Sequence, residues 1–261
     1  MTLYKTEASD FEVVEIEGKQ RTLLSSAAGE RFNSSLLGLG DLNEAATSTD
    51  AIAAVFDLEG FTNFCKQIEP QLAVPVFLSA FLPWLIEKIK DVAIQDEHPK
   101  GLRLYSPLPF FIKYMGDGIL VLFDSSEMGN IKRRNIIVQL DKVCKKYLSE
   151  FLPKMRPKVV DVPEHLRCGI ARGTVFSVGD GNDYVGSCIN MAARIQKLPG
   201  TRFAFNRRGF EFEDTTNKFF KEAVIVRKVA IRGINENELI GIRKSEFDKM
   251  QSEDKALYRD P

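Results

Sequence analysis

AIAAVFDLEGFT, residues 51–62, is the stretch of sequence that indicates the fold most directly. Its apolar run ends at Asp57, and this pattern predicts a buried strand that delivers a carboxylate to the rim of a sheet. The next residues, GFTNFCKQI (60–68), predict the start of a helix that Thr62 or Asn63 could cap. Because most acids at strand ends are solvated caps, Asp57 alone is weak evidence for a functional site.

Beyond this stretch a long helix is expected over 74–92, and Pro83 should kink it or mark its true start. Apolar strands over 102–113 and 119–123 flank the sequence Met115-Gly116-Asp117-Gly118, which is a hairpin signal. A helix over 131–152 follows, with one apolar face made of Ile137, Leu140, Val143, Cys144, Tyr147 and Leu148.

The remaining pattern predicts a second hairpin around Gly173, with strands over 166–172 and 174–178. After it come a short helix over 187–196 and closing strands over 223–231 and 238–243. Helices that alternate with hairpins, rather than with single strands, predict an α+β fold in which helices cover a sheet.

Three regions are expected along the chain. Residues 1–50 are polar and mixed, with a short strand over 11–16 and a turn-rich connector over 31–42, so they form an N-terminal extension. Residues 51–245 form the main domain, and 246–261 a polar C-terminal tail. A chain of 261 residues with 44% apolar residues can build one sizeable core.

Composition excludes several classes of function. The chain carries 36 basic and 36 acidic side chains, so its charge gives no reason to expect nucleic acid as a partner. Four cysteines without a C-x-x-C pair, together with two histidines, favour buried thiols in a reducing compartment over a zinc site. The apolar run 72–86 is shorter than the about 20 residues of a membrane span and contains two prolines. We therefore expect a cytoplasmic protein without a membrane partner, and no signal peptide is visible.

Two further motifs carry polar residues. The turn at 115–118 leaves Asp117 projecting, which taken alone is an ordinary hairpin turn. In DYVGSCINMAAR (183–194), Asn190 and Arg194 are four residues apart and share a helix face, an arrangement that suits a phosphate and an adjacent ribose.

Taken together, the three motifs indicate one family far more specifically than any one of them does alone. Phe-Asp-x-x-Gly-Phe-Thr, Lys-x-x-Gly-Asp-Gly and Asp-Tyr-x-Gly-x-x-x-Asn-x-Ala-x-Arg, in this order, resemble the class III adenylate and guanylate cyclases over residues 51–243. The resemblance implies a cyclase-like sheet with a ferredoxin-like core. It also implies cyclisation of a nucleoside triphosphate to a 3′,5′-cyclic monophosphate, with pyrophosphate as the leaving group.

The resemblance also assigns roles to individual residues. Asp57 and Asp117, with the backbone carbonyl of Leu58, match the family's ligands for two divalent cations, Mg²⁺ or Mn²⁺. Asn190 matches the residue that orients the ribose, and Arg194 the one that stabilises charge on the α-phosphate. The remaining matches are the base-reading pair Lys113 and Asp183, and Arg232 at a terminal-phosphate position.

In the family the metal-binding acids and the transition-state residues of one site come from different subunits. This chain has both sets, so the resemblance implies a head-to-tail homodimer with two shared active sites.

The sequence leaves open which nucleobase the substrate carries. Lys113 and Asp183 match the adenylate pattern. The stand-alone architecture and the Leu-Pro-Phe-Phe-x-Lys segment (108–113) instead resemble the pyrimidine cyclases of bacterial Pycsar anti-phage systems, which make cyclic UMP or cyclic CMP for a separate effector. The favoured interpretation is a uridylate cyclase whose base pocket is crowded by Tyr105, Phe110 or Phe111. The alternatives are an adenylate cyclase and an inactive cyclase-like dimerisation or regulatory module.

Overall fold

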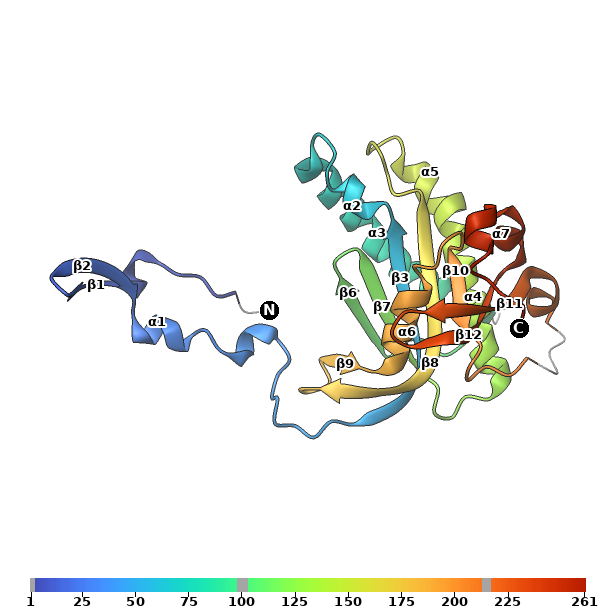
Figure 1. The fold of residues 1–261 in the computed structure, drawn as a ribbon, viewed down its shortest axis with the longest axis horizontal. Helices are drawn as coiled ribbons and strands as arrows, with labels where there is room; N and C mark the ends of the chain where they lie inside the picture. Colours follow the sequence, from blue (N-terminus) through green and yellow to red (C-terminus); the bar gives the residue numbers. More distant parts are fainter. Residues whose placement is uncertain (1–2, 98–102, 213–216) are drawn as a thin grey trace. The chain divides into compact units, whose positions relative to one another are not determined.

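A mixed β-sheet forms the framework of residues 48–175 and 186–261, which make up the larger of two compact units (Figure 1). The structure is a computed structural model and describes residues 3–97, 103–212 and 217–261. The strands of this sheet are β3 (Ser48–Glu59), β6 (Phe111–Met115), β7 (Gly118–Asp124), β8 (His165–Val178), β10 (Phe203–Asn206), β11 (Val224–Ile231) and β12 (Asn235–Arg243). Their spatial order is β11-β12-β10-β8-β3-β7-β6, with β8 and β10 parallel.

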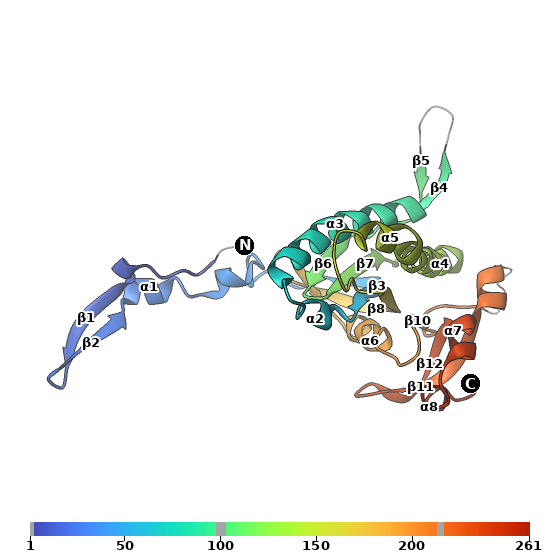
Figure 2. The same cartoon turned by 90° about the horizontal axis from the view of Figure 1, so that it is seen from above.

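Helices cover both faces of this sheet (Figure 2). On one face lie α3 (Pro70–Val92) and α4 (Asn130–Lys146), and on the other lies α6 (Ser187–Ile195). Side chains of β3 alternate between the faces, so Ile52, Ala54 and Phe56 join the core beneath α3 and α4. The remaining helical segments are α2 (Phe61–Phe64), a π-helical turn (Tyr147–Phe151), α5 (Leu152–Met155), a second π-helical turn (Phe219–Ala223), α7 (Lys244–Lys249) and α8 (Ser252–Lys255).

The smaller unit combines the chain up to residue 47 with residues 176–185. It contains the hairpin of β1 (Phe11–Ile16) and β2 (Lys19–Leu24), a 3₁₀ turn on each side of α1 (Ala8–Asp10 and Ser34–Leu37), α1 itself (Ser26–Glu30) and β9 (Asp183–Val185). β9 pairs with the last residues of β8, and residues 39–47 hold the loop between these strands. The Asp180 N–H donates to the Leu39 carbonyl (3.1 Å), and the Thr47 N–H donates to Ser177 Oγ (2.8 Å).

The α+β class predicted from the sequence is confirmed, and so are the first hairpin and the short helix. Met115 pairs with Gly118 across the β6–β7 turn, where Gly116 has φ 79°. Such a left-handed conformation is readily adopted by glycine, which explains why Gly-Asp forms the turn. The two closing strands are also present, as β11 and β12.

The predicted hairpin around Gly173 is wrong, because β8 continues without a turn from His165 to Val178. The glycine instead makes room for helix α6: a Cβ added at this position would lie 3.2 Å from the Cys188 Cβ. Its small size therefore serves packing between strand and helix rather than a reversal of the chain.

The predicted strand over 102–113 is also wrong in its extent. Residue 102 lies outside the described residues, and 103–105 form β5, which pairs with β4 (Ile94–Glu97) in a separate sheet. Pro107 and Pro109 lie in the irregular segment before β6. Because proline has no N–H to donate to a neighbouring strand, these residues interrupt the predicted strand. Tyr105 thus belongs to β5 rather than to the strand of Lys113.

Three helix details differ from expectation. Gly60, with φ 84°, precedes α2 as its N-cap, in place of Thr62 or Asn63. Pro83 lies within α3, which begins at Pro70. Leu148 is 41% exposed, although the other five residues of the predicted apolar face are buried. The π-helical turn at 147–151 explains this, because its wider repeat rotates the following side chains off the α-helical register.

α3 is the one helix of the described residues that is long and apolar enough, by length and composition, to cross a membrane. Phe77, Phe81 and Leu85 on one of its faces are buried in the core. Leu72, Val76 and Ile86 are exposed, so the helix is buried on one face only.

The contact between α6 and β8 gives a test of the fold. A Cβ at Gly169 would lie 2.2 Å from the Ala192 carbonyl oxygen and 2.6 Å from the Gln196 nitrogen, both of them backbone atoms. We therefore expect Gly169→Ala to lower the free energy of unfolding by about 3 kcal/mol, through overpacking, in urea denaturation. Gly129→Ala is the control, since no atom lies within 4 Å of its added Cβ, and it should change stability by less than about 0.5 kcal/mol. Equal stabilities of the two variants would contradict this packing.

Candidate active site

The two acids singled out by the sequence lie side by side at one end of the β3–β7 ladder. Asp57 pairs in register with Gly118, and the Leu58 N–H donates to the Asp117 carbonyl oxygen (3.4 Å). Asp57 is buried, and Asp117 is half-buried in the hairpin turn. The two carboxylates and the neighbouring Leu58 carbonyl are hard oxygen donors of the kind that Mg²⁺ and Mn²⁺ prefer.

The acid pair makes a partial coordination set. No group of three or more His, Cys, Asp or Glu that could hold a metal occurs in the described parts of the chain. A divalent cation at Asp57 and Asp117 would therefore complete its shell with carbonyl, water or phosphate oxygens, as Mg²⁺ commonly does in nucleotide sites. The residues present fit such a cation.

A third residue, which the sequence analysis did not select, joins the acid pair. The Arg167 guanidinium on β8 donates from Nη2 (2.7 Å) and Nε (3.2 Å) to Oδ2 of Asp57. The available signal was an arginine within the otherwise apolar strand Leu166-Arg167-Cys168-Gly169-Ile170, where a charged side chain needs a partner.

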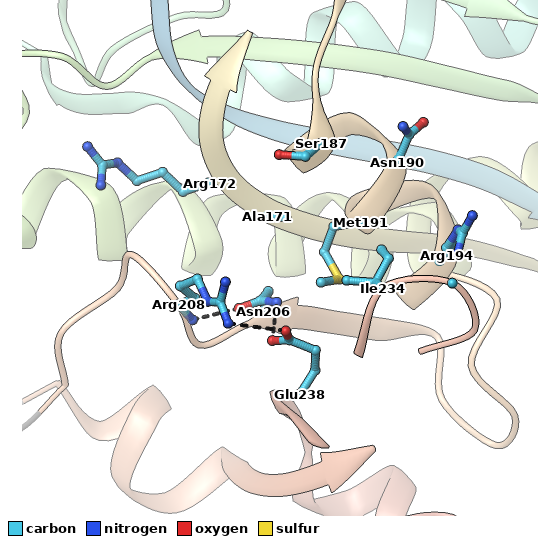
Figure 3. A pocket seen from close by; sticks show the side chains of 11 residues that line it. Ala171, Arg172, Ser187, Asn190, Met191, Arg194, Asn206, Arg208, Ile234 and Glu238 are labelled. Carbon is cyan, nitrogen blue, oxygen red and sulfur yellow. Dashed lines mark hydrogen bonds and ion pairs between the residues drawn. The ribbon is translucent and has the colours of Figure 1, made fainter. Parts of the chain in front are cut away.

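A second cluster forms around α6. Asn190 and Arg194, one helical turn apart, line a cavity of about 340 Å³ (Figure 3). β8, β10 and β12 supply the other walls, together with the turn at Gly233. The predicted grouping of Asn190 with Arg194 is thus accompanied by a concave surface. A larger cavity, of about 600 Å³, lies beside the start of α3 and contains none of the predicted site residues.

The turn after β11 lies against Arg194. A Cβ placed on Gly233, which has φ 71°, would be 2.8 Å from Arg194 Nη1. Arg232 directly precedes this glycine and is exposed. The fold therefore brings the turn that carries Arg232 to the Arg194 guanidinium.

Three cavity residues were missed from the sequence: Asn206, Arg208 and Glu238. Glu238 is buried and accepts hydrogen bonds from Asn206 Nδ2 (3.1 Å), Asn235 Nδ2 (3.1 Å) and Arg208 Nη2 (3.3 Å). Asn235 lies on β12 with Glu238, whereas Asn206 and Arg208 lie at and after the end of β10, at least 30 residues earlier, so no local motif reveals the whole group. The arrangement fixes a negative charge and amide groups opposite the Asn190–Arg194 helix face (Figure 3).

The two clusters are separate within one chain. None of Asp57, Asp117 and Arg167 lines the cavity that contains Asn190 and Arg194. The acid pair and the Asn190–Arg194 pair therefore form two distinct groups in the structure.

The predicted base readers lie in different units. Lys113, on β6, pairs with Leu120 of β7. Strand alternation places Phe111 on the same face of β6 as Lys113. Phe110 precedes β6. Asp183 is the first residue of β9 in the smaller unit, so its pairing with Lys113 stays a prediction.

No protein-family model and no curated protein matches the sequence. Among solved structures, the chain is similar to the catalytic core of a rhodopsin-guanylyl cyclase with converted specificity, in complex with ATPαS (13% identity, 77% of this chain, 98% of the other, TM-score 0.47). It is also similar to the RhGC guanylate cyclase domain from Catenaria anguillulae in complex with GTP (15%, 76%, 100%, 0.44). A third is an adenylate/guanylate cyclase/hydrolase from Silicibacter pomeroyi (14%, 76%, 98%, 0.44). At these identities and TM-scores the likeness assigns no activity to this chain.

Proposed function

We propose that this protein is a class III nucleotide cyclase, which converts a nucleoside triphosphate into a 3′,5′-cyclic monophosphate and pyrophosphate with two divalent cations. The observation that carries the proposal is the placement of the three motifs. Asp57 and Asp117 are adjacent across β3 and β7, while Asn190, Arg194 and the Arg232 turn meet at a separate cavity. If the three motifs matched the family by chance, their polar residues would have no reason to lie together in the folded chain.

In this proposal Asp57, Asp117 and the Leu58 carbonyl hold Mg²⁺ or Mn²⁺. Bound cations would lower the pKa of the ribose 3′-hydroxyl and neutralise charge on the triphosphate. Asn190 orients the ribose so that its 3′-oxygen is in line with the α-phosphorus. The Arg194 guanidinium donates to the α-phosphate oxygens, on which negative charge develops in the transition state. Arg232 binds the terminal phosphate that departs with pyrophosphate.

The separation of the two clusters favours a shared site. A head-to-tail homodimer would bring the acid pair of one copy to the Asn190–Arg194 pair of the second copy, and symmetry would create two equivalent sites. The chain contains both halves, so no different partner chain is needed.

For the base we propose uracil. Phe111 lies on the same strand face as Lys113 and would fill the space that a purine occupies. Lys113 can donate to a uracil carbonyl, and Asp183 can accept from uracil N3–H. The product, cyclic UMP, would act in the cytoplasm as an antiviral messenger for a separate effector. The same Lys113 and Asp183 favour ATP as the alternative substrate. An inactive regulatory module is disfavoured because the sequence retains Asp57, Asp117, Asn190 and Arg194.

Product analysis with the four ribonucleoside triphosphates at equal concentration and Mn²⁺ tests this proposal. We expect cyclic UMP to dominate. No cyclic nucleotide from any of the four would contradict the cyclase, whereas predominance of cyclic AMP would leave the cyclase standing and replace uracil by adenine.

Phe111→Ala gives a sharper test of the base pocket. Removing the ring should lower the ratio of kcat/KM for UTP to kcat/KM for ATP by about tenfold, since pocket shape contributes about 1–3 kcal/mol to such discrimination. Ile112→Ala is the matched control, because Ile112 lies on the opposite face of β6 and should leave the ratio unchanged. Equal ratios for Phe111→Ala and wild type would remove Phe111 from the pocket.

A further inference from the structure

The Asp57 carboxylate is already paired with a positively charged side chain, that of Arg167. Both the Nη2 and Nε atoms of Arg167 donate to Oδ2 of Asp57, and the Asp57 side chain is 5% exposed. A buried carboxylate of this kind is costly unless it is paired, and the Arg167 guanidinium is the partner that the folded chain provides. Asp57 is also one of the two acids that we propose bind the metal.

A guanidinium and a divalent cation compete for this carboxylate. Arg167 occupies Oδ2 with two hydrogen bonds, and a metal bound to the same oxygen would place a double positive charge next to a single one. Like charges this close repel each other more strongly in a partly buried site than in water. The competition therefore requires either that the metal leaves Oδ2 alone or that the guanidinium moves.

The structure provides a place for the displaced guanidinium. Arg167 lines a cavity of about 430 Å³ together with Glu59 and Glu246. Glu59 is paired with Arg202 (3.2 Å), and both of those side chains are about two-fifths exposed. Such an exposed pair contributes little, so Glu59 can accept a second cation at small cost. Rotation of the Arg167 side chain would exchange the Asp57 carboxylate for the Glu59 one without leaving a buried charge unpaired.

We propose that Arg167 is a positioning residue that holds Asp57 until a divalent cation displaces it, and that this exchange sets the metal affinity of the site. The inference rests on the proposed metal-binding role of Asp57. If the acid is paired with Arg167 in nine molecules of ten, the apparent metal affinity falls about tenfold, because only the unpaired fraction is competent to bind.

The test is Mn²⁺ binding to the full chain, measured by electron paramagnetic resonance of free Mn²⁺. Arg167→Met keeps an unbranched apolar stem and removes the charged guanidinium, so we expect its dissociation constant for Mn²⁺ to fall about tenfold relative to wild type. Arg227→Met is the control: the Arg227 side chain is buried to a similar extent but pairs with Asp260, away from both Asp57 and Glu59, so its dissociation constant should stay within about twofold of wild type.

A second readout covers the case in which Arg167→Met folds poorly. Without metal the variant leaves Asp57 unpaired and should melt several degrees below wild type, and saturating Mn²⁺ should raise its melting temperature more than that of wild type. Arg167→Lys keeps the charge and should bind Mn²⁺ with intermediate affinity. Unchanged or weaker Mn²⁺ binding by Arg167→Met, with wild type binding Mn²⁺, overturns the role of Arg167 alone. Absence of Mn²⁺ binding in every variant and in wild type overturns the metal assignment of Asp57 as well.

Discussion

Asp117→Asn is expected to lower kcat by about a thousandfold or more while leaving the protein folded. The asparagine keeps the size of the side chain in the β6–β7 turn but loses the charge that would bind a divalent cation. Loss of several kcal/mol of transition-state stabilisation corresponds to a rate loss of this size. Asp57→Asn should abolish activity as well, although it also breaks the ion pair with Arg167, so Asp117 gives the cleaner test. The measurement is kcat with Mn²⁺, accompanied by urea denaturation.

Asp124→Asn is the matched control for this experiment. Asp124 lies at the other end of β7 and accepts a hydrogen bond from the Ser126 N–H, so it is an acid of the same hairpin remote from the proposed site. Its kcat should stay within about twofold of wild type. Near-normal turnover by Asp117→Asn would show that the acid pair is not the metal site.

Asp57→Asn and Arg194→Ala should each be inactive alone and should regain activity when their subunits are mixed. In a head-to-tail dimer each site takes its acid pair from one copy and its Asn190–Arg194 pair from the other. A mixed dimer then contains one site with both lesions and one intact site. With random pairing half of the dimers are mixed, so recovery of about a quarter of wild-type activity is the ceiling. The physical reason is that the acid pair lies outside the cavity that Asn190 and Arg194 line in the same chain.

The control for complementation mixes two lesions of the same half. In a mixed dimer of Asp57→Asn and Asp117→Asn each site contains one damaged acid pair, so no activity should return. Subunit exchange is verified with a tagged copy and mass spectrometry. Recovery in the control pair, or none in the test pair after verified exchange, would reject the shared site.

The elements that could be predicted from the sequence are those whose signals are local. The Gly-Asp turn of β6–β7 and helix α6 depend on residues a few positions apart, and both are present. Gly173 was misjudged because its role depends on Cys188, which reaches it only when α6 packs on β8. β10 is four residues long, too short for its alternation to be seen.

The candidate site divides in the same way. Asp57, Asp117, Asn190 and Arg194 are candidates that the sequence offers, because each belongs to a short motif that resembles those of one family. Arg167 and Glu238 were not, because each takes its meaning from a partner on a distant strand: 110 residues separate Arg167 from Asp57, and 32 separate Glu238 from Asn206. Pairings across a sheet follow from topology, which no short window of sequence contains.

The pairing of the first 47 residues with 176–185 has a consequence for the synthesis of the chain. Thr47 leaves the ribosome 130 residues before Ser177, its hydrogen-bond partner. At usual elongation rates this is roughly ten seconds, during which residues 39–47 have no partner strands to bind. Until residues 176–185 have been made, a nascent-chain chaperone or a protease can reach this segment.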